Sequence, residues 1–170
     1  DAPPALGIVL DGLGLGDDGT VWGGELLLGG YAEVRRVGHL TPFHLPGGDL
    51  AMREPWRNAF VQLRQAFADG WQVHVDGLEI GRLLQTQRLD LLVRQIERGV
   101  NAPLASSAGR LFDAAAALAG IAPSRQSYEG QAAMAFEAHA APFSPLRRTR
   151  LPFAKGRRCK LIRDRSGPTS

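Results

Sequence analysis

The chain has 170 residues, 44% of them hydrophobic, and a formal net charge of +3, so it is long enough to bury the core of one domain. Its apolar runs are far shorter than the roughly 20 residues that span a bilayer. The single cysteine, Cys159, excludes an internal disulfide, and the sequence has no C-x-x-C or H-x-x-x-H pattern for zinc or iron. We therefore expect a cytoplasmic protein with no membrane partner.

Charge divides the chain into two unlike parts. Residues 1–146 carry 11 arginines and 16 acidic residues, a net charge of −5, whereas residues 147–170 carry nine basic residues and one acidic residue, a net charge of +8. Basic tails are typically solvated or bind nucleic acid. The Arg, Pro, Gly and Ser bias of this tail is also typical of GC-rich DNA translated out of frame. We expect a domain over 1–146 and a disordered or frameshifted tail over 147–170.

The N-terminal segment predicts an antiparallel meander. The short apolar run 6–11 predicts a buried strand, and Asp17–Gly19 predicts the turn that follows it. A second strand is expected over 21–28, with a bulge or a close backbone approach at Gly23–Gly24. Alternating polar and apolar residues over 31–37 predict a third strand.

The remainder of residues 1–146 favours helices. Residues 39–55 are rich in proline and glycine and predict an irregular loop. Helices are expected from Trp56 to about residue 69, once or twice within 76–98, after a cap at Ser106 or Ser107, and from about 126 to 139. The expected buried faces of the first and third of these regions consist of apolar residues at helical spacing: Trp56, Phe60, Leu63 and Phe67, then Leu111, Phe112, Ala115 and Leu118.

Asp11 is the first residue that suggests chemistry, because it ends the apolar run and opens a turn with Gly12, Gly14 and Gly16. Such a turn brings a carboxylate and free backbone N–H groups together, as in phosphate and metal sites. The alternative is an Asx turn in which Asp11 only closes its own loop.

Two later segments pose a similar choice. Asp113 lies near the positive end of a predicted helix, where it is either a hydrogen-bond acceptor for ribose hydroxyls or a solvated residue of the first turns. Gly130 and Gln131 either begin the last helix or form a wall of a ligand cleft.

Seven segments in order resemble the HypF carbamoyltransferases, which supply cyanide ligands to nickel–iron hydrogenases. They are LDGLG (10–14), DGTVWGGE (18–25), HL (39–40), LPGGD (45–49), REPWR (53–57), NAPLASSAGRLFDA (101–114) and YEGQAAM (128–134). The resemblance covers residues 6 to about 140. It implies an α/β fragment of a Kae1-like domain, the ATP-binding fold of actin, hexokinase and Hsp70, with antiparallel strands followed by helices.

The resemblance also implies a reaction. Carbamoyl phosphate and ATP would form a carbamoyl-adenylate, and the carbamoyl group would pass to a HypE-type acceptor protein. Asp11 matches a ligand of a divalent metal ion, iron or zinc, while Gly12, Leu13 and Gly14 match the phosphate-facing turn. Asp113 matches a ribose contact, and Gly130 with Gln131 lies near the same pocket. The resemblance identifies no catalytic residue.

Several departures from the family pattern bear on activity. Leu13 stands where the family usually has a threonine, and the histidines and the second aspartate that bind the metal in relatives have no match here. We therefore expect this piece to be inactive alone. The resemblance makes nucleic acid an unexpected partner. The alternative is a non-enzymatic fragment whose basic tail binds nucleic acid.

Overall fold

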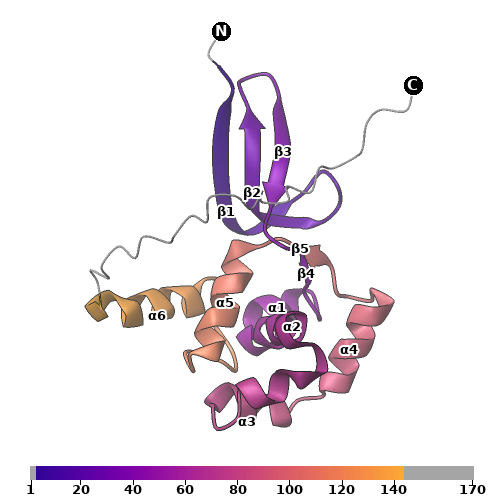
Figure 1. Cartoon of the computed structure of the whole chain (residues 1–170), viewed down its shortest axis with the longest axis vertical. Helices are drawn as coiled ribbons and strands as arrows, with labels where there is room; N and C mark the ends of the chain where they lie inside the picture. The colour runs from indigo at the N-terminus through magenta and orange to yellow at the C-terminus, as the bar shows by residue number, and fades with distance from the viewer. Residues whose placement is uncertain (1–2, 144–170) are drawn as a thin grey trace, which may run out of the picture.

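The structure, a computed structural model, describes residues 3–143; the predicted boundary at 146 and the basic tail lie outside this range. The long strands of a five-stranded sheet stand on a body of helices (Figure 1). The strands are β1 (Ala5–Leu15), β2 (Val21–Gly29), β3 (Val34–His39), β4 (Phe43–His44) and β5 (Leu104–Ala105). The α-helices are α1 (Asp49–Arg53), α2 (Pro55–Phe67), α3 (Glu79–Gln85), α4 (Leu89–Arg98), α5 (Ala108–Leu118) and α6 (Gln131–Ala140), and Ala68–His74 and Ala141–Phe143 are 3-10 helices. The predicted α/β class, antiparallel strands followed by helices, is confirmed.

The strands β1, β2 and β3 form the predicted antiparallel meander. β2 also pairs in parallel with β5 through Val21 and Ala105, and β4 pairs with β5. The expected close approach at Gly23–Gly24 is confirmed, because a Cβ on Gly23 would lie 2.5 Å from the Asp11 carbonyl oxygen. The bulge lies in β1 instead: Leu10 faces Gly24 and Gly14 faces Trp22, which leaves 11–13 opposite one residue of β2.

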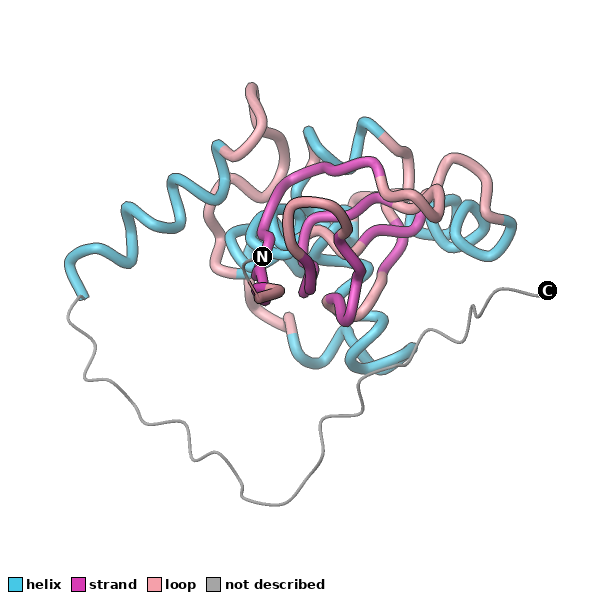
Figure 2. The backbone as a smooth tube through the Cα atoms, turned by 90° about the horizontal axis from the view of Figure 1, so that it is seen from above, coloured by secondary structure: helices cyan, strands magenta, loops and turns pink. Residues whose placement is uncertain are grey.

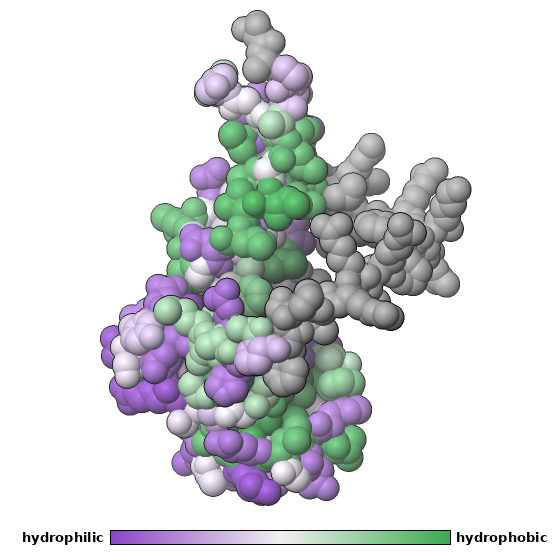
Figure 3. All heavy atoms as spheres, turned by 90° about the vertical axis from the view of Figure 1, so that its left-hand side faces the viewer, coloured by the Kyte–Doolittle hydropathy of each residue, from purple (hydrophilic) through white to green (hydrophobic). Residues whose placement is uncertain are grey.

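The prediction that the first strand is buried is wrong. Ile8 is 71% exposed and Leu10 is 63% exposed. The strands rise clear of the helices in Figure 1, and Figure 3 shows apolar side chains gathered on this part of the surface. An apolar run predicts a strand but not what covers it, and no helix within 3–143 lies over this part of the sheet.

The main core lies among the helices. α2 begins with Pro55 at its first turn, where the missing N–H costs nothing. Phe60 meets Trp71 edge to face with ring centroids 5.7 Å apart, a favourable aromatic geometry. Further buried members of this cluster are Trp56, Leu63, Ile80, Leu84, Leu92, Ala114 and Ala117. Phe67, which was expected on this face, is half-exposed because α2 ends there and the chain turns into the 3-10 helix.

The segment 39–55 contains more structure than the sequence predicted, namely β4 and α1. Its turns are held by distant backbone groups: the Leu45 N–H donates to Pro103 O at 2.9 Å, and the Gly47 N–H donates to Asn101 O at 2.8 Å. Gly47 has φ of 91°, which glycine adopts without strain. Contacts with the chain just before β5 therefore order a segment that looks irregular in sequence.

Helix α5 has the predicted cap, but only part of the predicted face is covered: Leu118 packs against the main core. The Ser107 hydroxyl accepts the Arg110 N–H at 3.1 Å. Leu111 and Phe112 are half-exposed, whereas Arg110 is 1% exposed and Asp113 is 0% exposed. The small residues of α5 pack against α2. This packing turns Arg110 and Asp113 inward and turns Leu111 and Phe112 outward.

The last helix begins later than predicted, at Gln131, after Gly130 with φ of 82°. α6 extends away from the helical body in both views (Figures 1 and 2). Within residues 3–143, no helix is long and apolar enough to span a membrane.

Candidate functional site

The glycine bulge of β1 lies against the first turn of α5. The Ser107 hydroxyl donates to Gly12 O at 2.5 Å and lies 3.3 Å from Asp11 O. Gly109 allows this contact, because a Cβ there would lie 2.7 Å from Gly12 Cα. The bulge is therefore fixed beside the positive end of an 11-residue helix.

The bulge brings together four predicted site residues, Asp11 to Gly14. Asp11 is exposed, and its Oδ1 accepts the Gly12 N–H at 2.6 Å. The carboxylate therefore forms a hydrogen bond within its own turn. Leu13 is half-exposed, while a Cβ on Gly14 would lie 3.3 Å from Trp22 O. The roles of these residues toward phosphate and metal remain predictions.

The absence of a side chain at Gly12 lets the carboxylate of Glu129 lie against the turn. A Cβ at this position would lie 2.3 Å from Glu129 Oε1 and 3.5 Å from Arg110 Nη2. The space above Gly12 is therefore held by a carboxylate and backed by a guanidinium. The sequence singled out Gly12 but gave no sign that Glu129, far along the chain, reaches it.

Behind the bulge lies an ionic cluster in which Arg110 and Asp113 are buried and Glu129 is half-exposed. Arg110 Nη1 lies 3.2 Å from Asp113 Oδ2, and Arg110 Nη2 lies 3.2 Å from Glu129 Oε1. Burial raises the pKa of Asp113 to about 6, although Arg110 and a hydrogen bond from Gln126 oppose this. The alternative that Asp113 is a solvated surface residue is wrong, because its carboxylate is covered; its ribose role remains a prediction.

Gln126 is a hydrogen-bonding residue of the site that the sequence did not single out. Its Nε2 donates to Met52 O and, at 3.3 Å, to Asp113 Oδ2, while its Oε1 accepts the Ala132 N–H at 3.0 Å. One side chain therefore joins α1, α5 and α6. The signal was weak, since a glutamine in a polar stretch has no characteristic spacing.

Gly130 and Gln131 form the start of α6, which is one of the two alternatives that the sequence left open. Gly130 is the N-cap residue, and Gln131 Oε1 accepts the Ser127 N–H at 2.6 Å. Both directly follow Glu129, so they belong to the segment that reaches the bulge. Their role near a nucleotide remains a prediction.

A second buried network surrounds Glu25, which is 2% exposed. Its Oε2 accepts the N–H groups of Gly23 and Gly24 at 2.6 and 2.5 Å, and its Oε1 accepts from Arg36 at 2.9 Å and from the Ser106 hydroxyl. Arg36 also reaches Asp18 at 2.9 Å. Hydrogen bonds, chiefly from the Thr20 hydroxyl, lower the pKa of Asp18 to about 2. This network joins β2 and β3 to the residues just before α5.

The described residues do not form a complete metal site. Within 3–143, no three His, Cys, Asp or Glu side chains lie together as metal ligands would, and Asp11 alone offers one carboxylate. A bound metal would need most of its ligands from elsewhere, so no chemical step here is assigned to it.

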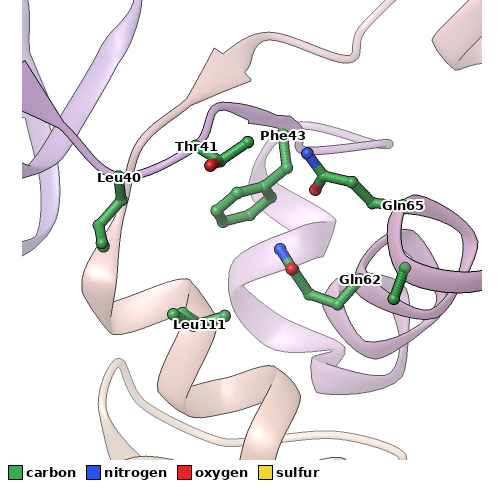
Figure 4. Close-up of a pocket in the computed structure, with 7 residues that line it drawn as sticks. Leu40, Thr41, Phe43, Gln62, Gln65 and Leu111 are labelled. Atoms are coloured by element: carbon green, nitrogen blue, oxygen red, sulfur yellow. The ribbon is translucent and has the colours of Figure 1, made fainter. Parts of the chain in front are cut away.

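A hollow of about 330 Å³ lies elsewhere, between α2, the start of α5 and the chain before β4 (Figure 4). The amides of Gln62 and Gln65 border it from α2, the Phe43 ring borders it from β4, and Leu111 borders it from α5. Its lining consists of Leu40, Thr41, Phe43, Gln62, Gln65, Ala66 and Leu111. None of these residues titrates, and none was a predicted site residue.

Comparison with known proteins now identifies the family. The family model described as "Carbamoyltransferase, Kae1-like Domain, second subdomain" matches residues 7–163. The chain belongs to the HypF carbamoyltransferase family.

Individual HypF proteins agree in sequence and fold. The carbamoyltransferase HypF of Rhodobacter capsulatus is 56% identical over 139 residues, which cover 82% of this chain and 18% of that protein. HypF2 of Cupriavidus necator is 48% identical over 134 residues, or 79% of this chain and 16% of that protein. A crystal structure of full-length HypF in a phosphate- and nucleotide-bound form is 35% identical, with a TM-score of 0.67 over 79% of this chain and 17% of that one. The chain thus spans only a small part of these HypF proteins.

Proposed function

We propose that this chain is part of an enzyme that forms carbamoyl-adenylate from carbamoyl phosphate and ATP and passes the carbamoyl group to a HypE-type acceptor. Membership of the HypF family supports carbamoyl transfer. The description of a solved HypF as phosphate- and nucleotide-bound supports ATP as a ligand.

The observation that carries the proposal is the glycine bulge against the N-terminus of α5. Helix N-termini attract anions through their N–H groups and their positive dipole end. The position of a Cβ on Gly12 is occupied by the Glu129 carboxylate, so a phosphate group would take this position when Glu129 moves away. Gly12, Leu13 and Gly14 would hold phosphate oxygens there, and correct positioning would supply much of the rate.

The other nucleotide contacts are proposed with one structural condition. Asp113 would accept hydrogen bonds from ribose hydroxyls, with Gly130 and Gln131 nearby. Because Asp113 is covered by Gln126 and Arg110, this role requires the segment around Gln126 to move away from α5. Asp11 would contribute one ligand to an iron or zinc ion, which would supply positive charge near the phosphates.

A chimaera tests the function. Residues 7–143 would replace the matching residues of the Rhodobacter capsulatus HypF, and carbamoyl-phosphate-dependent ATP turnover would be measured. We expect an active chimaera that loses activity on Gly12→Val, because the valine side chain fills the proposed phosphate space. The matched control is Gly30→Val, where a Cβ meets nothing within 4 Å.

Two results would contradict the proposal: a folded chimaera without activity, or full activity with Gly12→Val. We expect no turnover from the present chain alone, since residues 3–143 hold one candidate metal ligand and not a complete set.

A further inference from the structure

The carboxylate of Glu129 lies where the side chain of residue 12 would be. Its Oε1 is 2.3 Å from the position of a Cβ on Gly12 and 3.2 Å from Arg110 Nη2. A carboxylate and a phosphate group both present oxygen anions to an arginine fork. Glu129 therefore fills a position suited to a ligand oxygen.

The guanidinium of Arg110 is poorly satisfied by its present partners. The side chain is 1% exposed, and neither Nε nor Nη1 makes a hydrogen bond within residues 3–143, although Nη1 lies 3.2 Å from Asp113 Oδ2. Leaving a buried charged donor without a partner is costly. A tetrahedral anion offers more acceptor oxygens than one carboxylate oxygen does, and it would satisfy these donors better.

We propose that Glu129 occupies the binding position of a phosphate group, and that a phosphate-bearing ligand displaces it and takes over Arg110. This inference rests on the proposed phosphate role of the Gly12 turn. It adds Arg110 as an anion-binding residue and Glu129 as an internal competitor for the same position.

The side chain of Glu129 lies where it can move away from Arg110. Its side chain is 55% exposed, and it belongs to the turn before α6, where Gly130 adopts a φ of 82°. Displacement breaks the ion pair between Glu129 and Arg110, which water partly screens. It forms an ion pair between the buried guanidinium of Arg110 and the phosphate group. Asp113 stays as the second partner of Arg110.

The test measures binding of inorganic phosphate to the full 170-residue chain by calorimetry at low ionic strength. Glu129→Gln keeps the shape of the side chain but removes the competing charge, so we expect about tenfold tighter binding, or about 1.4 kcal/mol. The matched control, Glu137→Gln, removes the same charge from the far part of α6, and we expect less than about a twofold change because of screening. Arg110→Lys should weaken binding and cancel the gain from Glu129→Gln.

A second measurement does not depend on the variants folding. The Arg110 Nε–H signal in the NMR spectrum of the wild-type chain should shift during the phosphate titration, because that group gains an acceptor. Parallel titrations with ATP and acetyl phosphate distinguish a nucleotide from an acyl phosphate as the source, and the tighter ligand identifies it.

Equal phosphate affinity of wild type and Glu129→Gln would overturn the inference, as would an unmoved Arg110 signal at saturating phosphate. Neither result touches the carbamoyl-transfer proposal, which the chimaera tests separately.

Discussion

Replacing Asp113 by asparagine tests whether a buried carboxyl group makes the stability of this chain depend on pH. The pKa of Asp113 is raised from its ordinary 3.8 to about 6 because burial excludes water. Between these values the folded chain holds a proton that the unfolded chain has released, so the free energy of unfolding falls as pH rises. One pKa unit corresponds to about 1.36 kcal/mol, which gives a loss of about 3 kcal/mol between about pH 4 and about pH 7.

The assay is urea unfolding of wild type and Asp113→Asn across that range, followed by tryptophan fluorescence, since Trp56 and Trp71 lie in the core. The stability of wild type minus that of the variant should fall by about 3 kcal/mol from about pH 4 to about pH 7 and then stay level. Asp17→Asn, in the exposed turn after β1, should give a flat difference. A difference for Asp113→Asn that is constant or grows with pH would refute the reasoning.

Three further predictions concern the strands and the core. Ile8→Lys should change the free energy of unfolding by less than about 0.5 kcal/mol, because Ile8 is 71% exposed, whereas Phe60→Ala should cost about 3–5 kcal/mol in the same urea assay. Glu25→Ala should cost at least about 1–3 kcal/mol, because the buried N–H groups of Gly23 and Gly24 lose their acceptor, and a loss below about 1 kcal/mol would contradict the network. Gly24→Ala should lower the melting temperature by several degrees, because its Cβ would lie 2.5 Å from Ser106 O; Gly30→Ala, with open space around it, should leave it nearly unchanged.

Several elements of this fold are encoded by residues that are close together in the chain. The meander, α2 and the capped helix α5 follow from local patterns: alternation, helical spacing and a serine before a helical stretch. The family resemblance was equally readable, because its motifs are continuous stretches of residues. These predictions hold because the backbone preferences that produce them act between near neighbours in the chain.

Burial was harder to predict. The apolar strand β1 is exposed, and α5 turns Asp113 inward and Phe112 outward. A pattern of apolar residues gives the period of an element but not its rotation or its cover. Here the packing of α5 alanines against α2 fixed the rotation, and ion pairing made the inward turn of Arg110 and Asp113 tolerable.

The sequence by itself determined the family, the kinds of elements and the glycine turn at Asp11–Gly14, since each is encoded within a few neighbouring residues. Only the tertiary structure decided that Glu129 lies over Gly12 and that Arg110 joins it to Asp113. The first of these contacts spans more than a hundred residues of chain, and its geometry depends on how β1, α5 and the turn before α6 pack together. Packing of this kind balances many weak interactions at once, and no local pattern records it.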